Sequence, residues 1–152
     1  MIFNTAMKEI KNALLESDSW TAMFAYSAYS DGSDHIFLYQ LDPSILDDGL
    51  PICLITNGSA WNRTVQGFGG VFTTNSDIIL HFEMKYDDSE YTDNEILEEF
   101  SDFVGEVMLD LEKSTACHLL VEYAPESTNT PAISNLSDEE SFVSFRVRLR
   151  GR

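Results

Sequence analysis

The feature that most constrains the fold is the run from Asp93 to Lys113, which has the pattern of one amphipathic helix. Apolar residues recur at helical spacing along one side, and acidic residues occupy the other. The spacing of Thr92 and Glu95 is that of a capping box, so the helix start is marked independently of its periodicity. The pattern predicts one long helix laid across a sheet. The apolar side holds Ile96, Leu97, Phe100, Phe103, Val104, Val107, Met108 and Leu111, and the acidic side holds Glu95, Glu98, Glu99, Asp102, Glu106 and Asp110.

Strand patterns lie on both sides of this helix in the sequence. The cleanest alternation of apolar and polar residues runs from Asp77 to Tyr86, and a second runs from Phe142 to Leu149. An apolar stripe over residues 3–17 predicts an N-terminal helix. We therefore expect one α+β domain over residues 1–152, with a mixed or antiparallel sheet of about four to six strands and helix 93–113 packed on one face. Shorter strands are predicted at Ile36–Tyr39, Pro51–Thr56, Ala60–Val65 and His118–Tyr123.

Other segments give weaker signals. Asn57-Gly58 is a hairpin turn signal and predicts that the strands on either side of it pair with each other. Residues 20–30 are apolar but weakly periodic, which fits either a strand or an irregular packed segment. Residues 124–141 are polar and predict a long loop of the kind that binds partners or is disordered. Gly105, inside the long helix, costs about 1 kcal/mol relative to Ala and indicates close packing against the sheet there.

The charge of the chain is large and unevenly placed. The formal net charge is −17, from 26 acidic and 9 basic residues, and this argues against binding the phosphate backbone of DNA or RNA. Four of the nine basic residues stand at alternate positions near the C-terminus: Arg146, Arg148, Arg150 and Arg152. Such segregation suits contact between complementary surfaces.

Neither the cysteines nor the N-terminus suggests a secreted or membrane protein. Cys53 and Cys117 lie far apart without a Cys-x-x-Cys motif, so we expect two buried thiols rather than a zinc ribbon or a disulfide framework. No basic segment precedes an apolar core at the N-terminus, and no stretch approaches the ~20 apolar residues of a membrane helix. We expect a soluble cytoplasmic protein.

No group of residues in the sequence predicts a reaction. His35, His81 and His118 lack the spacing of metal ligands, and the run Gly67-Phe68-Gly69-Gly70 lacks the lysine of a phosphate loop. We therefore predict no catalytic, cofactor-binding or metal site. The ordinary interpretation of the acidic side of the long helix is a solvated face. The ordinary interpretation of the C-terminal arginines is cross-strand pairing with Glu83.

The layout of the chain resembles the tail terminator and tail-completion proteins of long-tailed bacteriophages. The resemblance lies in the order of elements and in Leu50-Pro51-Ile52, the strand Ile78–Tyr86 and the segment Phe145-Arg146-Val147. It implies a structural protein, not an enzyme, that forms a hexameric ring on a completed tail tube and takes part in joining the head. The implied partners are further copies of itself, the tail tube protein and a head-completion protein. The implied location is the virion tail, and the bacterial cytoplasm during assembly.

A ring requires two different patches on every copy. We expect the arginines at 146, 148 and 150 to face the acidic side of a neighbouring subunit's long helix. Loops carried by a rigid sheet commonly bind partners, so the tip 67–76, with Phe68 and Phe72, and the loop 125–140 are expected to contact tube or head proteins. The acidic residues of the expected interface are Glu98, Glu99, Asp102 and Glu106.

Two other classes of protein are also compatible with the sequence. An acidic chaperone of the type III secretion kind has similar size, acidity and α-β-β-β-α-β-β order, and would form a homodimer around an unfolded effector segment. This chain differs from that pattern in ending on an arginine-rich strand. An acidic inhibitor or nucleic-acid mimic is suggested by charge alone. Six-fold against two-fold assembly separates the first two classes, and binding to a basic nuclease would support the third.

Overall fold

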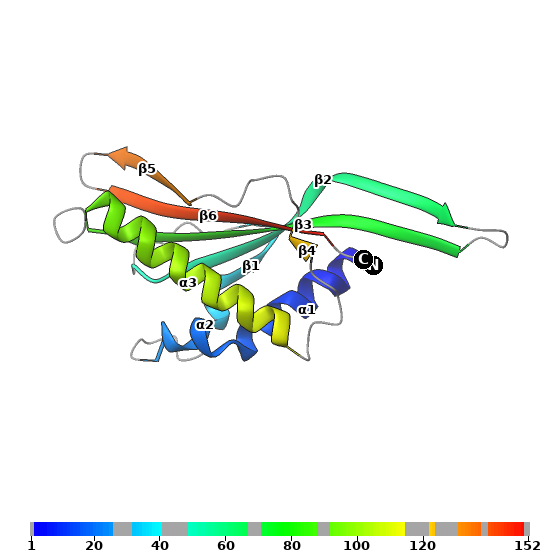
Figure 1. Cartoon of the computed structure of the whole chain (residues 1–152), viewed down its shortest axis with the longest axis horizontal. Helices are drawn as coiled ribbons and strands as arrows, with labels where there is room; N and C mark the ends of the chain where they lie inside the picture. Colours follow the sequence, from blue (N-terminus) through cyan, green and yellow to red (C-terminus); the bar gives the residue numbers. More distant parts are fainter. Residues whose placement is uncertain are drawn as a thin grey trace.

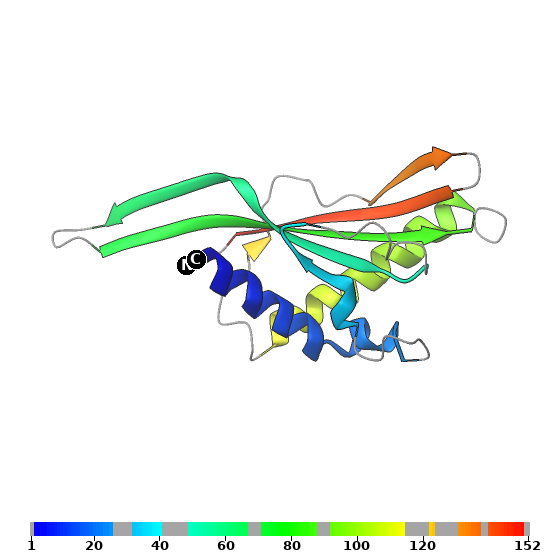
Figure 2. The same ribbon diagram turned by 180° about the vertical axis from the view of Figure 1, so that it is seen from behind.

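The computed structural model describes the backbone of residues 2–25, 32–40, 49–66, 71–87, 92–114, 122–123, 131–137 and 140–150. Within these ranges the chain forms one sheet with its helices on one side, in both the front and the back views (Figures 1 and 2). The α+β prediction is confirmed. The elements are α1 (Ile2–Glu16), α2 (Asp18–Ala22), a 3-10 turn η1 (Ser33–His35), β1 (Ile36–Leu38), β2 (Ile52–Gln66), β3 (Val71–Tyr86), α3 (Asp93–Lys113), β4 (Glu122–Tyr123), β5 (Pro131–Ser137) and β6 (Glu140–Arg150).

The described strands form a six-stranded mixed sheet in the order β1-β2-β3-β6-β4, and β5 also pairs with β6. β1 is parallel to β2, and the other pairs are antiparallel. At the centre, Cys53 pairs with Phe82, and Phe82 pairs with Phe145. Residues that face each other across strands share a side of the sheet, so this register decides which side chains meet the helices.

The apolar core lies between the helices and the face of the sheet that they cover. In β3, Ile78, Leu80 and Phe82 are buried, whereas His81 and Glu83, which alternate with them, are partly exposed, as the pattern predicts. Full burial of one large apolar side chain contributes about 1.5–3 kcal/mol, so the whole row strongly fixes the strand register. The core is completed by Met7, Ile10 and Leu14 of α1, by Ile96, Phe100, Val104, Val107, Met108 and Leu111 of α3, and by Val143 and Val147 of β6.

α3 begins and ends where the sequence predicts. The Thr92 hydroxyl accepts from the Glu95 backbone N–H at 3.3 Å, and the Glu95 carboxylate accepts from the Thr92 N–H at 3.0 Å. The predicted capping box is therefore confirmed. One further bond ties the helix start to the end of β3, because the Tyr86 hydroxyl donates to Asp93 Oδ1 at 3.2 Å.

Residues 18–22 of the segment after α1 form helix α2 and residues 23–25 form a turn, so the described part of residues 20–30 is not the strand that was one of the two expectations. α2 begins at once because Ser17, at its N-cap, accepts from the Trp20 N–H at 3.1 Å. The helix buries Trp20 against Phe24, Phe82 and Phe103, with ring centroids 5.1, 6.3 and 6.2 Å apart. This aromatic packing explains the run of apolar residues without strand periodicity. Residues 26–31 lie outside the described ranges.

The predicted turn at Asn57-Gly58 is wrong, because β2 runs through it. β2 and β3 pair continuously except for a register shift between Asn57 and Trp61. Asn57 lies opposite Ile78 and Trp61 lies opposite Ser76, so the β2 side carries two extra residues at that point. A bulge accommodates such an excess while pairing continues on both sides, and Asn and Gly tolerate its backbone angles. The hairpin therefore joins β2 to β3 instead.

The polar segment after α3 also differs from the prediction. Part of the expected loop 124–141 is strand β5, which pairs with the first half of β6 from Pro131 opposite Phe145 to Ser137 opposite Glu140. Pro131 stands at the start of an edge strand, where a missing N–H is tolerated. Backbone pairing overrides the low strand propensity of a Ser- and Asn-rich segment here. Of the expected strand His118–Tyr123, the described residues are β4.

β2 and β3 extend well beyond the body of the sheet as a two-stranded arm (Figure 1). In the arm, residues 61–66 pair with residues 71–76. β6 follows β3 as far as Arg150 opposite Asp77, so no described strand flanks the arm on that side. Two-stranded ribbons are marginally stable on their own in water, and the arm is therefore a natural segment for contact with another chain.

Candidate assembly surfaces

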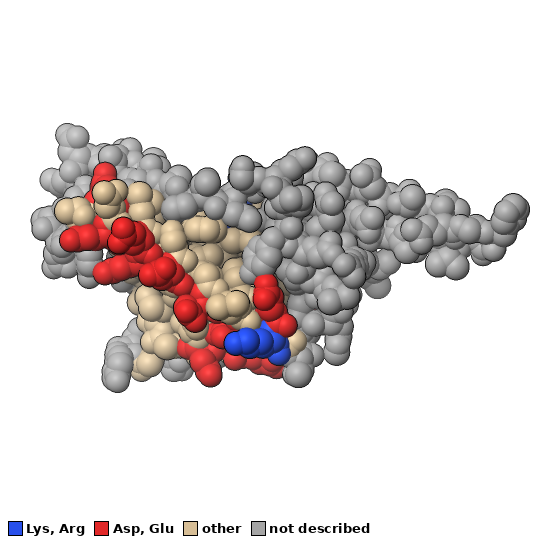
Figure 3. Space-filling model, viewed as in Figure 1, with Lys and Arg blue, Asp and Glu red and all other residues tan. Residues whose placement is uncertain are grey.

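α3 carries the predicted acidic residues on its outer side. Glu98, Glu99, Asp102 and Glu106 are all exposed, and in the space-filling view acidic side chains form a diagonal band along the helix (Figure 3). Steps of four residues follow one side of a helix, so three of them stand in line at 98, 102 and 106. We call Glu98, Asp102 and Glu106 the acidic row.

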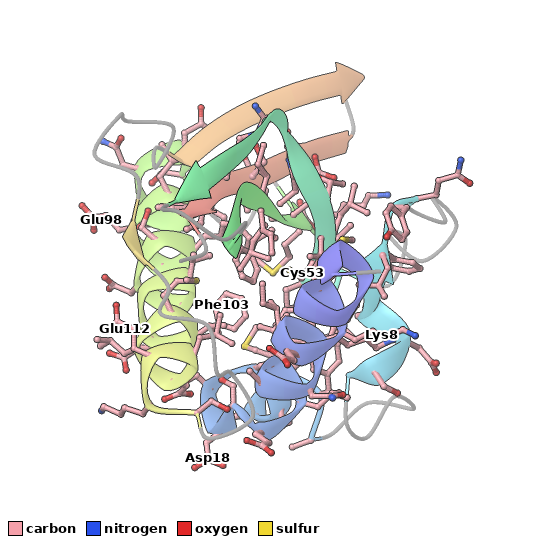
Figure 4. The ribbon with its side chains drawn as sticks, turned by 90° about the vertical axis from the view of Figure 1, so that its right-hand side faces the viewer. Lys8, Asp18, Cys53, Glu98, Phe103 and Glu112 are labelled. Carbon is pink, nitrogen blue, oxygen red and sulfur yellow. The ribbon has the colours of Figure 1, made fainter. Side chains whose placement is uncertain are left out.

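The stick view separates the two sides of the helix. Glu98 and Glu112 point outward from α3, whereas Phe103 points toward the interior that also holds Cys53 (Figure 4). The apolar residues of α3 form part of the core, so the acidic row is not needed to hold the helix on the sheet. Its charges are free to serve another purpose at little cost in folding energy, because exposed charges contribute little to stability.

A shallow groove of about 420 Å³ lies beside the acidic row. Among the described residues it is lined by Leu97, Glu98, Ser101 and Asp102. Leu97 packs against the edge of the core and is partly buried, so the groove combines apolar surface with carboxylates. A long cationic side chain, with an apolar stem and a charged end, has the matching chemistry.

Gly105 stands one helical turn after Ser101. The prediction that it packs closely against the sheet is wrong, because Gly105 is exposed and a Cβ built there meets no described atom within 4 Å. Leu109, another turn along, is 46% exposed. Leu97, Ser101, Gly105 and Leu109 therefore form an uncharged row next to the acidic row, with the small residues Ser101 and Gly105 at its centre; we call it the low row.

We call Arg146, Arg148 and Arg150 of β6 the arginine row, and its described side chain, Arg146, lies on the side of the sheet that α3 does not cover. Arg146 is exposed, whereas its neighbour Val147 points to the core, as the alternation predicts. Arg146 pairs with His81 across the sheet, and its Nε donates to His81 Nδ1 at 3.5 Å, a long hydrogen bond. Arg148 and Arg150 hold the next alternate positions of β6. Their side chains lie outside the described part of the structure.

His81 and Glu83 are titratable groups on the same open face as Arg146. Burial lowers the pKa of His81, and the positive charge of Arg146 lowers it further. Burial raises the pKa of Glu83. The register places Ser144 opposite Glu83, and Arg146 contacts His81, so direct cross-strand pairing of Arg146 with Glu83 is not the arrangement of this sheet.

The remaining predicted interface residues are only partly described. Phe68 lies outside the described residues. Phe72 belongs to the arm, in register with Val65, and its side chain is not described. Of the expected loop 125–140, the part that the structure describes is strand β5 and the first residue of β6.

Cys53 and His35 occupy the interior. Burial raises the pKa of the Cys53 thiol, which is fully buried, as predicted for a small apolar residue. His35 is buried beside Phe24, with ring centroids 4.9 Å apart. Cys117 and His118 lie outside the described ranges. Within those ranges, no three His, Cys, Asp or Glu side chains gather in a way that could hold a metal ion.

Asp110 has a structural role that its place in the acidic pattern does not reveal. Its Oδ2 accepts from the Ser17 hydroxyl at 2.7 Å and from the Ser19 N–H at 3.1 Å. The Ser17 bond is the main reason why the pKa of Asp110 is lowered. α3 thereby clamps the start of α2. The sequence signal for this was Ser17 itself, a good N-cap residue, but the carboxylate that completes the cap is 93 positions away.

A scan against protein-family models finds no match, and a search of curated proteins also finds none. In the described part of the chain, no helix has the length and apolar character needed to cross a membrane.

Proposed function

We propose that this protein is a structural subunit that joins further copies of itself into a closed ring, as the tail terminators that it resembles do on a phage tail tube. The supporting observation is the placement of opposite charges on opposite sides of one sheet. Asp102 lies on the outer side of α3, and Arg146 lies on the face of the sheet that α3 does not cover. The two cannot meet within a chain, whereas between chains they can.

Contact between two different patches is a heterologous interface. Repeated from copy to copy, it closes into a ring when the rotation per copy divides a full turn. A two-fold dimer would instead need both patches within one interface, because residue i of one copy then contacts residue j of the other and residue j contacts residue i. Separate acidic and basic patches favour the first geometry, because like charges would face each other in many two-fold arrangements.

The arm supplies a second element of the proposal. Residues 57–76, which contain the arm, include no Asp or Glu and one basic residue, Arg63, although the whole chain has 26 acidic residues. A ribbon without acidic residues that extends from an acidic body can lie against other acidic chains with little repulsion. In the proposed function the arm contacts the tail tube or the head-completion protein.

The mass of the purified protein tests this proposal. We expect light scattering to give closed oligomers of one size, negative-stain images to show rings, and both to be lost on Arg148→Glu/Arg150→Glu substitution. Added salt should also weaken the assembly, because exposed charges are screened. A protein that stays monomeric at every soluble concentration, or that forms salt-independent two-fold dimers, would contradict the proposal, and the dimer would favour a secretion chaperone. Flanking genes for a tail tube or a portal would support the tail assignment independently.

A further inference from the structure

We infer that the outer side of α3 is a docking track for the arginine row of a second copy, with Arg148 of one copy opposite Asp102 of the next. This inference rests on the proposed function and specifies its interface. The acidic row and the low row together form the track. The occupant is a second copy because the chain itself carries a matching basic row at alternate positions of β6, of which Arg146 lies on the face that points away from its own α3.

The spacing between residues is similar in the arginine row and in the acidic row. In a strand, alternate residues are about 6.7 Å apart, which is the expected separation of residues 146, 148 and 150 along β6. In a helix, residues four apart are separated by about 6.0 Å, which applies to residues 98, 102 and 106 along α3. The mismatch is about 1.4 Å over the three positions, which long Arg and Glu side chains can absorb.

The number of available carboxylates on α3 equals the number of arginines in the arginine row. Four acidic residues follow the same line on α3, at positions 98, 102, 106 and 110. Asp110 is already engaged with Ser17 and Ser19, so three remain for three arginines. Arg148 and Asp102 are the central members of their rows. They therefore face each other whether the partner strand runs parallel or antiparallel to the helix.

The low row is consistent with close approach of a backbone. Gly105 destabilises an exposed helix interior relative to Ala, and no described residue of the same chain uses the space above it. Ser101 and Gly105 leave room beside the acidic row, and the groove lined by Leu97 can hold the apolar stem of an arginine. A partner strand can therefore lie near the helix, with its arginines over the carboxylates.

A charge-swap cycle tests the predicted pair. Asp102→Arg alone places arginine against Arg148, and Arg148→Asp alone places aspartate against Asp102, so each should weaken self-association about tenfold or more. The double variant restores an opposite-charge pair and should recover most of that loss. Glu112→Arg, at an exposed position of α3 outside the acidic row, is the matched control, and Arg148→Asp should not rescue it. Sedimentation velocity gives the association constants.

The outcomes are distinguishable. Recovery in the double variant, without rescue of Glu112→Arg, supports the docking track. If the unsubstituted protein assembles but the two substitutions simply add, this inference is wrong and the proposed ring stands. If the unsubstituted protein does not assemble, both fail. If the acidic row instead binds a basic protein and never a second copy, the inference is also overturned.

Discussion

The two faces of the sheet differ in what they contribute. On the face covered by α1 and α3, Leu80 and Phe82 are fully buried, and apolar contacts account for the packing. On the open face, His81 and Glu83 of the same strand are partly exposed, and Arg146 is exposed. β3 thus packs apolar side chains into the core on one side and carries polar side chains on the other. Substitutions one residue apart should therefore change stability and assembly separately.

The largest expected effect is on the covered face. Phe100→Ala should lower the free energy of unfolding by about 3–5 kcal/mol, because it leaves a cavity in a site where Phe100 is 1% exposed. Arg146→Ala, on the open face, should change it by less than about 0.5 kcal/mol. Urea unfolding followed by circular dichroism measures both. Equal losses would show that the open face is part of the stability core.

A second prediction concerns the turn before η1. Gly32 has φ +70°, and an added Cβ would lie 2.5 Å from Phe24 Cδ2 and 2.7 Å from Trp20 Nε1. Gly32→Ala should therefore cost more than about 2 kcal/mol, from backbone strain and overpacking together. Gly49 is the matched control, because its φ is +72° but its nearest contact, Lys85 O, is 3.9 Å away. Gly49→Ala should show the backbone cost of about 1–2 kcal/mol alone. Similar thermal shifts for the two variants would contradict this account of Gly32.

A third prediction concerns the clamp between α2 and α3. Ser17→Ala removes the N-cap of α2 and one bond to Asp110, and should cost about 1–2 kcal/mol in urea unfolding. Thr21→Ala serves as the comparison, since its hydroxyl bonds the Ser17 carbonyl within the same turn, and should cost less.

The same clamp predicts a pH dependence. The pKa of Asp110 is lower in the folded than in the unfolded chain, so its contribution is fully present above the unfolded value of about 3.9 and is lost as pH falls through the folded value. Asp110→Asn should be less stable at neutral pH and lose less stability between about pH 5 and about pH 2. The midpoints of urea unfolding across that pH range measure this difference. Parallel pH curves for the unsubstituted protein and the Asp110→Asn variant would contradict the role given to Asp110.

The smallest effect has the opposite sign. Gly105→Ala should raise the free energy of unfolding of the isolated chain by about 0.5–1 kcal/mol, because Gly105 is exposed inside a helix and a Cβ there meets no described atom. In the proposed assembly the same substitution should weaken self-association, since a partner strand lies over that position. Calorimetry at low concentration and sedimentation at high concentration separate the two. A gain in both would argue against a close partner at Gly105.

The elements that the sequence predicted well are those with strong local periodicity. α3 was found to the residue because the capping box and the apolar row agree. Of β3, the part from Asp77 to Tyr86 was found because its alternation matches one buried face, whereas residues 71–76, expected in a hairpin tip, are also strand. The exposed position of Arg146 followed from the same alternation. These signals depend on neighbours in the chain, which a sequence displays directly.

The elements that were missed depend on distant contacts. Asn57-Gly58 resembles a turn locally, but pairing with β3 on both sides holds β2 extended. β5 exists because β6 offers an edge, and α2 is fixed by a carboxylate on α3. Gly105 was assigned to the packed side of α3, although it stands on the outer side, beyond Ser101 and near the acidic row. Its real position suggests a partner instead.

If two different faces of one chain meet between copies, two variants that each lack one of the faces should associate only when they are mixed. One variant lacks the acidic row (Glu98→Gln/Asp102→Asn/Glu106→Gln), and the other lacks the arginine row (Arg146→Ser/Arg148→Ser/Arg150→Ser). Each should be monomeric alone, because no intact pair of faces remains. Mixed in equal amounts, they should form one-to-one dimers that cannot close into a ring, since one competent junction survives. Rings in either separate sample, or monomers alone in the mixture, would contradict the account.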